Sequence, residues 1–214
     1  MGNSLLVAEL VCARLCDDLG VLLASMKGSL DVASEQTNGG ALATARVASD
    51  GLTRRVALMR CAWANNQTRL SVKRLGELAD ALPGAHRLRT DLSGFPSRTV
   101  FPASMGRVVL NVMFLASESL PRGGTITLSP HQGDDILIAI AGTHAAWPAG
   151  FAEMLSDPES AWSSLENGGR LIPSLVALIS IRFGIRVSLL PPDGTKRRGK
   201  PAAKLLVSAG SIRE

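Results

Sequence analysis

The chain has 214 residues, a net charge of +5 and 46% hydrophobic residues. This is enough apolar material for one large or two small domains, and it excludes a disordered chain. The longest mostly apolar stretches, 108–116 and 171–181, fall short of the ~20 residues of a membrane helix. The start of the chain lacks the basic cluster of a secretory signal. We therefore expect a cytoplasmic protein without a membrane partner, whose odd number of cysteines are reduced thiols.

Apolar or small residues recur through positions 1–80 at alternating spacings of three and four, the pattern of two helices in a bundle. The first run extends from Leu5 to Ala33 and the second from Ala45 to Leu70, with turn-forming residues at 36–40 between them. A single hairpin cannot bury both apolar stripes. The sequence therefore predicts an antiparallel helical hairpin domain that pairs with a second copy, giving a homodimer built on a four-helix bundle.

After Pro83-Gly84 the pattern changes to short strands and helices, which marks a second domain over residues 86–214. Strands are predicted at 87–92, 124–129, 135–141, 185–190 and 204–209, and helices at 102–120, 148–155 and 171–183. This order favours an antiparallel or mixed sheet that is covered by helices on one face. The fold class expected for the whole chain is α+β.

Basic residues gather in two places, one spread over positions 54–74 and one a run near the end over positions 196–204. We interpret them as a solvated helix face and a hairpin tip, and an acidic protein partner is the alternative. Aromatic residues make up only 4% of the chain, with no tyrosine to stack on bases. Since no DNA-binding motif accompanies the charge, we expect no nucleic-acid partner.

Cys12 and Cys16 lie one helical turn apart, but no histidine or further cysteine lies near them in sequence. We interpret them as small core residues rather than a metal pair, and we expect no metal site.

Two segments carry a family resemblance. Residues 14–19 read Arg-Leu-Cys-Asp-Asp-Leu, and residues 109–124 form a predicted helix that ends in Leu-Pro-Arg-Gly-Gly. In order and spacing they resemble the bacterial histidine phosphotransferases of the ChpT type. The resemblance implies a dimerising helical hairpin followed by a degenerate histidine-kinase-like ATP-binding domain, an α/β sandwich. Proteins of that type pass a phosphoryl group between the receiver domains of hybrid kinases and response regulators in two-component phosphorelays.

The chain departs from this family at the phosphoacceptor. The family motif reads Arg-Leu-Cys-His-Asp and its His accepts the phosphoryl group, whereas this chain has Asp17 there, followed by Asp18. At 100° per residue Asp17 lies about 200° from Leu15 and Leu19, so it points away from the hairpin seam. A carboxylate beside a second carboxylate repels an incoming phosphoryl group, which a neutral imidazole does not. We expect Asp17 to occupy the acceptor's position without its chemistry.

The second domain also departs from the nucleotide-binding pattern of the kinase-like superfamily. The segment Asn-x-x-x-Asn-Ala aligns with 111–116, where Leu115 replaces the metal-binding Asn and has no lone pair to offer. The Asp-x-Gly-x-Gly segment is replaced over 141–146, and only Gly168-Gly169 remains of the glycine-rich lid. We expect no ATP, no other cofactor and no ATP-dependent kinase activity.

The first hypothesis is a dimeric signalling protein that docks receiver domains around Arg14, Leu15, Val21 and the acid pair Asp17-Asp18, without passing on the phosphoryl group. The alternative is an active phosphotransfer enzyme with a different acceptor, so the sequence leaves enzymatic activity open. The histidines of the chain are His86, His131 and His144.

Overall fold

The computed structural model describes residues 2–35, 39–64, 68–191 and 203–209. The expected turn at 36–38 and the basic run at 196–200 lie outside these ranges. The chain divides into two compact units, residues 1–60 and 61–214. Within the described ranges, no helix combines the length and the apolar character needed to cross a membrane.

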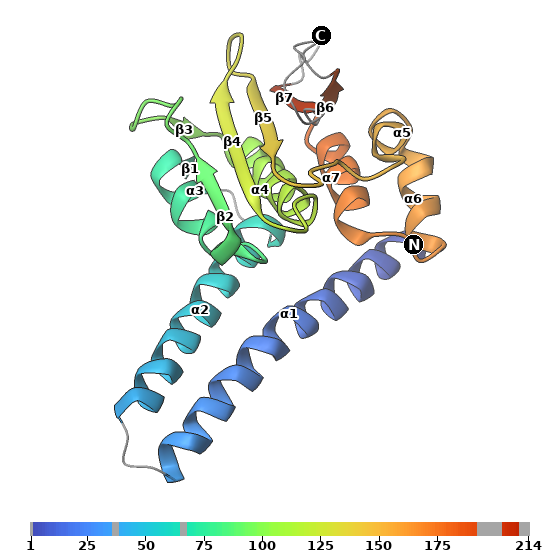
Figure 1. Ribbon diagram of the computed structural model, residues 1–214. Helices are drawn as coiled ribbons and strands as arrows, with labels where there is room; N and C mark the ends of the chain where they lie inside the picture. The colour runs from blue at the N-terminus through green and yellow to red at the C-terminus, as the bar shows by residue number, and fades with distance from the viewer. Residues whose placement is uncertain (1, 36–38, 65–67, 192–202, 210–214) are drawn as a thin grey trace. The chain divides into compact units, whose positions relative to one another are not determined.

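The first unit consists of two long helices, α1 (Gly2–Glu35) and most of α2 (Gly39–Trp63) (Figure 1). The side of α1 that carries Leu15 and Leu22 is half-buried, and so is the side of α2 that carries Leu52. Large apolar side chains elsewhere on both helices remain exposed. The predicted helical hairpin is therefore confirmed as a pair of helices, and each helix keeps an uncovered apolar surface.

The second unit is built on a five-stranded mixed sheet with the strand order β2-β4-β5-β7-β6. β2 runs parallel to β4, and the other neighbours are antiparallel. The strands are β2 (Leu88–Asp91), β4 (Gly124–Pro130), β5 (Ile136–Ala141), β6 (Ile185–Leu190) and β7 (Lys204–Ala209). In β5 every second residue is buried, as expected for a strand with one face on the core.

Helices α4 (Ala103–Glu118) and α7 (Leu171–Arg182) pack on each other and against one face of this sheet (Figure 1). α4 is apolar on nearly all sides and is buried from Val108 to Ser117, which is typical of a helix inside a core. Two short helices, α5 (Phe151–Ser156) and α6 (Pro158–Glu166), pack beside α7. The predicted α+β class is confirmed.

The first unit ends earlier than the predicted domain boundary at 80–86. A short strand, β1 (Leu70–Ser71), pairs antiparallel with β3 (Val100–Phe101), and helix α3 (Val72–Ala79) follows β1. Strand β2 is then reached through the short helix η1 (Ala85–Arg87). α3 is strongly amphipathic and lies in the second unit, where its apolar face is buried. Its buried residues Val72, Leu75 and Leu78 recur at a spacing of three, which is also a helical pattern, so the sequence shows no clear boundary between this helix and α2.

Two glycines allow three stretches of backbone to pass close together where β4 begins. Gly123 and Gly124 have positive φ angles of 81° and 150°. A Cβ atom on Gly123 would lie 2.4 Å from the carbonyl oxygen of Arg87, and one on Gly124 would lie 2.2 Å from the carbonyl oxygen of Ala141. Because both contacts are with backbone, a side chain here forces the strands apart.

We expect Gly124→Ala to lower the free energy of unfolding of the second unit by about 2 kcal/mol or more, because of this clash and the strained φ. Tryptophan fluorescence in urea measures it, since all three tryptophans belong to this unit: Trp63, Trp147 and Trp162.

Gly28→Ala is the matched control, because a Cβ atom at Gly28 on α1 meets no atom within 4 Å. We expect this control to leave the tryptophan-detected midpoint unchanged. Equal midpoints for Gly124→Ala and the wild type would contradict the role of Gly124.

Candidate functional site

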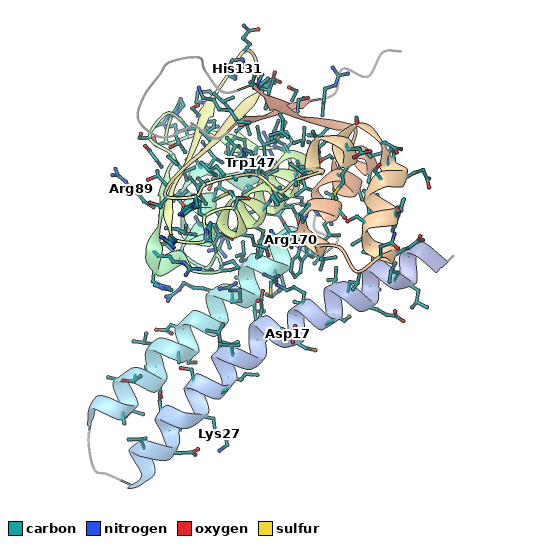
Figure 2. The ribbon with its side chains drawn as sticks, turned by 45° about the vertical axis from the view of Figure 1, so that its right-hand side comes forward. Asp17, Lys27, Arg89, His131, Trp147 and Arg170 are labelled. Atoms are coloured by element: carbon teal, nitrogen blue, oxygen red, sulfur yellow. The ribbon has the colours of Figure 1, made fainter. Side chains whose placement is uncertain are left out.

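The two adjacent acids of α1 lie in different environments. The Oδ2 atom of Asp18 lies 3.1 Å from Nε of Arg14, one turn away, and 3.7 Å from Nη1 of Arg55 on α2. These side chains are 17%, 27% and 14% exposed, respectively. Asp17, by contrast, is exposed on α1 (Figure 2). The acid pair thus separates into one carboxylate held by two guanidinium groups and one that faces solvent.

Arg55 joins the two helices of the first unit through Asp18. Burial is the largest cause that lowers the pKa of Arg55, the charge of Asp18 acts in the opposite direction, and Arg14 adds a smaller lowering. The Nε atom of Arg55 is buried and has no hydrogen-bond partner among the described residues. Asp18 is therefore the compensating charge of a partly desolvated arginine. Sequence reasoning placed Arg55 on a solvated face and missed this role.

The predicted docking residues do not all lie on one surface. Val21 is 73% exposed and follows Asp17 by one helical turn, so the two share a face of α1. Leu15 is half-buried. On α2, Val47 is 67% exposed, and helical geometry places it on the same side of the hairpin as Val21. We call Asp17, Val21 and Val47 the acceptor face. Val47 was missed because its spacing falls outside the apolar run of α2.

A second exposed surface runs along the other side of the hairpin. The residues of this surface on α1 differ in direction around the helix axis by about 20° at most, and those on α2 by about 40° at most. We call this surface the apolar stripe, and it consists of Leu5, Cys12, Leu23 and Leu30 on α1 with Leu42, Ser49 and Val56 on α2. Asp17 lies about 120° from Leu23 around α1, so the acceptor face and the apolar stripe are separate.

The cysteines of α1 correct one expectation. Cys12 and Cys16 are exposed rather than small core residues, and both are free thiols. Cys12 belongs to the apolar stripe and Cys16 lies beside it. The three-four spacing that predicted core positions here corresponds to an exposed surface of the single chain.

In the second unit, Asn111 and Leu115 are part of the buried core. Asn111 is fully buried, its Oδ1 accepts a hydrogen bond of 2.9 Å from Nε1 of Trp63, and its Nδ2 donates to the carbonyl oxygens of Ala62 and Arg107. Leu115 is also fully buried. Asn111 therefore has its amide donors and an acceptor lone pair engaged by protein, and Leu115 offers no ligand.

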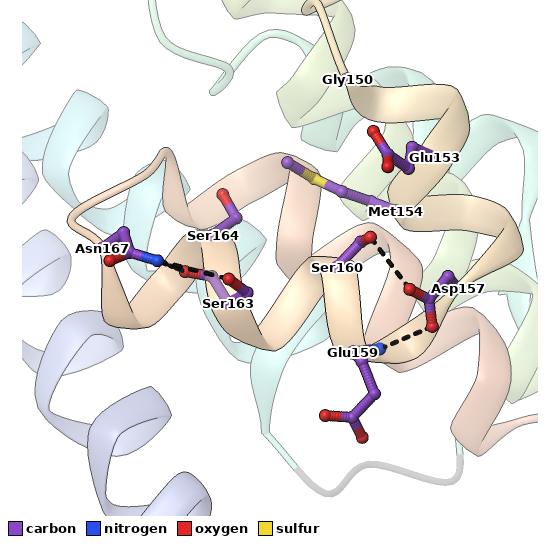
Figure 3. Close-up of a pocket in the computed structure, with 9 residues that line it drawn as sticks. All are labelled: Gly150, Glu153, Met154, Asp157, Glu159, Ser160, Ser163, Ser164 and Asn167. Atoms are coloured by element: carbon purple, nitrogen blue, oxygen red, sulfur yellow. Dashed lines mark hydrogen bonds between the residues drawn. The ribbon is translucent and has the colours of Figure 1, made fainter.

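A shallow, open hollow of about 460 Å³ lies along α5 and α6. Its wall is acidic and polar, with Glu153, Asp157, Glu159 and Asn167 among its residues (Figure 3). Asp157 caps α6 by accepting a hydrogen bond of 3.1 Å from the backbone nitrogen of Glu159. This carboxylate is therefore used by the helix, and no residue of α4 lines the hollow.

The profile of the histidine phosphotransferase C-terminal domain matches residues 72–189, which is more than half of the chain. The chain belongs to the histidine phosphotransferase family. The matched region lies in the second unit, so the membership rests on the α/β part and leaves the hairpin with Asp17 outside it. No curated protein matches the chain.

One of the solved structures similar to this chain shows the same fold. A bacterial phosphotransferase superposes with a TM-score of 0.69 at 15% identity, over 94% of this chain and 95% of that one. The mycobacterial sensor histidine kinase MprB has a TM-score of 0.44 at 15% identity, over 66% of this chain and 95% of that one. A histidine kinase domain from Erythrobacter litoralis EL346 has a TM-score of 0.41 at 14% identity, over 87% of this chain and 95% of that one. The first likeness covers both units and shows their fold.

Arg55→Gln tests the connection between the helices of the hairpin. We expect hydrogen exchange in peptides around residues 14–22 and 50–58 to become about fivefold faster, because removing the charge costs about 1 kcal/mol of local stability. Mass spectrometry of the full chain measures the exchange.

Lys27→Gln is the matched control. Lys27 pairs with Asp31 at 2.8 Å, but both side chains are exposed, and exposed pairs add little stability. Unchanged exchange is expected there, and equal behaviour of the two variants would contradict the role of Arg55.

Proposed function

We propose that this chain is a dimeric signalling protein that docks the receiver domains of response regulators or hybrid kinases on its acceptor face and does not carry the phosphoryl group at Asp17. Membership of the histidine phosphotransferase family supports the signalling role. The observation that carries the proposal is the exposed Asp17 carboxylate at the acceptor position, next to an ion-paired Asp18.

The chemistry of transfer argues against Asp17 as an acceptor. In a histidine relay a neutral imidazole nitrogen attacks the phosphorus of the receiver's acyl phosphate, and the P–N bond forms as the P–O bond to the receiver breaks. Asp17 offers an oxygen that is already negative, so charge accumulates as the phosphoryl group approaches. Phosphoryl transfer to an oxygen acceptor relies on cations that offset this charge. Among the described residues, no group of three His, Cys, Asp or Glu side chains is arranged to hold a metal ion.

The acceptor face nevertheless keeps features that suit a protein partner. Val21 and Val47 offer exposed apolar area on two helices. Arg14 lies about two turns before Val21 on α1, with its guanidinium directed to Asp18. Aliphatic side chains flanked by a partly exposed arginine are a common composition at interfaces. A protein with this surface can bind a receiver domain without chemistry, and so can compete with histidine-bearing proteins for it.

The competing function is phosphotransfer through one of the three histidines. His86, His131 and His144 are all exposed and all lie in the second unit, away in sequence from the acceptor motif. An exposed imidazole is chemically competent, so the transfer experiment below also tests these residues.

The apolar stripe supports the homodimer. Its members lie on one side of the hairpin, and several are large aliphatic side chains that remain exposed in the single chain. Burying such a stripe against a second copy gives the four-helix bundle expected of a helical hairpin, with the acceptor face left on the outside.

We expect the wild-type chain to have the mass of a dimer in light scattering at micromolar concentration. Leu23→Glu combined with Val56→Glu should dissociate it, because two charges per copy would be buried in the stripe. Val21→Glu is the control, since Val21 lies about 160° from Leu23 around α1, and it should remain dimeric. A monomeric wild type would refute the assembly.

We expect the wild-type chain to gain no radiolabel from phosphorylated receiver domains of its own organism, whereas Asp17→His should gain some, because Arg14 and Asp18 still flank the new imidazole. The gain is expected to be small, since a misplacement of about 1 Å can cost ~100-fold in rate. Gel autoradiography after mixing measures the label, and Asp17→Asn is the control that removes the charge without adding an imidazole.

One labelling result would overturn the proposal that this chain does not carry the phosphoryl group. Label on the wild-type chain that survives alkali would indicate a phosphohistidine, and its loss in His86→Gln, His131→Gln or His144→Gln would name the acceptor. Docking is tested separately by binding to unphosphorylated receiver domains, which Val21→Glu should weaken. The matched control Ile181→Glu, at an exposed aliphatic position of α7, should not weaken it.

A further inference from the structure

A small pocket in the second unit is lined by three arginines from different segments. Arg69 precedes β1, Arg74 lies in α3 and Arg107 lies in α4. The pocket measures about 90 Å³, which is room for about three waters or one small anion. The other lining residues are Cys61, Thr68, Leu70, Ala103, Gly106 and Leu110. No aspartate or glutamate is among them, so the polar part of the wall is strongly cationic.

Arg107 is the most constrained of these cations. Its Nε atom is buried without a hydrogen-bond partner among the described residues. Its Nη2 donates a long hydrogen bond of 3.4 Å to the carbonyl oxygen of Trp63, and its guanidinium carbon lies 4.9 Å above the centre of the Phe183 ring. Burial and then the charge of Arg182 both lower the pKa of Arg107. The described contacts of Arg107 are thus a carbonyl, a ring and a like charge.

The other two arginines have donors to spare. Arg74 pairs with Glu77 at 2.8 Å, but both side chains are 47% exposed, and an exposed pair of this kind is weak and exchangeable. Ser71 caps α3 by accepting a hydrogen bond of 3.1 Å from the backbone nitrogen of Arg74, which fixes the first turn that carries this side chain. Arg69 is exposed at the pocket.

The α4 helix adds a weaker contribution of the same sign. Its N-cap is Pro102, and no side chain caps the first turn, so the amides near Ala103 keep their positive end toward this region. The anion that three guanidinium groups recognise best has several oxygens for bidentate hydrogen bonds.

From this juxtaposition we propose that the pocket between the pre-β1 segment, α3 and α4 binds a small phosphate-type anion, either inorganic phosphate or the phosphate group of a small monoester. Binding places negative charge among the guanidinium groups of Arg69, Arg74 and Arg107. No residue of the acceptor face lines this pocket, and neither does Leu115. The proposal therefore does not depend on the proposed docking function.

Cys61 provides the measurement, because it lines the pocket while the other two thiols lie in the first unit. The wild-type full chain is alkylated in 50 mM inorganic phosphate or in chloride of equal ionic strength, and each thiol is quantified by peptide mass spectrometry. For a Kd of about 5 mM, Cys61 labelling should slow about tenfold in phosphate, whereas Cys12 and Cys16 should react equally in both buffers. A parallel sample with glycerol phosphate distinguishes a monoester site from one that admits only the free anion.

Variants test whether the arginines carry the effect. Arg69→Gln with Arg74→Gln changes exposed side chains, so folding is expected to survive, and protection of Cys61 should fall at least fivefold. Arg107→Met keeps the aliphatic stem and should remove protection, with circular dichroism as the check of folding. Arg89→Gln is the charge control, since Arg89 is exposed on β2 and does not line the pocket (Figure 2).

The proposal fails if phosphate and chloride give the same Cys61 rate. It also fails if the Arg69 and Arg74 double variant is protected as well as Arg89→Gln, because a general salt effect would then explain the protection. Neither outcome bears on receiver docking, which binding to unphosphorylated receiver domains tests independently.

Discussion

The buried amide of Asn111 organises the second unit. Its carbonyl oxygen faces the indole nitrogen of Trp63, which can only donate, and this fixes the orientation of the amide. The amide nitrogen then binds the carbonyl oxygens of Ala62 and Arg107, so a central core helix is tied to the end of α2. Trp63 stacks on Phe114 with ring centroids 5.3 Å apart. A buried amide without hydrogen-bond partners is costly. The end of α2 at Ala62 and Trp63 and the rotation of α4 about its own axis must therefore match each other.

The same helix shows how one fold serves different chemistry. A helix that is apolar on all sides must be covered on all sides, and the sheet with α7 supplies that cover whether or not a nucleotide binds. Leu115 is fully buried and adds to this core. On the hairpin the reverse holds. Asp18 has a structural partner in Arg55. The neighbouring Asp17 is exposed, so its side chain is not needed for packing.

Much of the fold could be predicted from the sequence because its elements are strongly patterned. The strands at 185–190 and 204–209 and the buried helix near 103–118 carry clear apolar runs between turn residues. Helix α6 was missed, although Asp157-Pro158 is a good N-cap signal, because its buried positions are few. The two-residue strands β1 and β3 are too short to show a period. At the site, the outward position of Asp17 follows from helical geometry, but the pairing of Asp18 with Arg55 depends on how two helices cross, which spacing does not encode.

The strand order of the sheet has a consequence for the time course of folding. β7, formed by residues 204–209, does not lie at an edge but between β5 and β6. This interior strand cannot pair until synthesis has passed it, and its partner residues in β5 lie about 70 positions earlier in the chain. Until then β5 and β6 each present an open edge, which is the kind of surface that pairs with other chains. Long-range pairings of this kind slow folding. Until β7 has been synthesised, the sheet of the second unit therefore lacks the strand between β5 and β6.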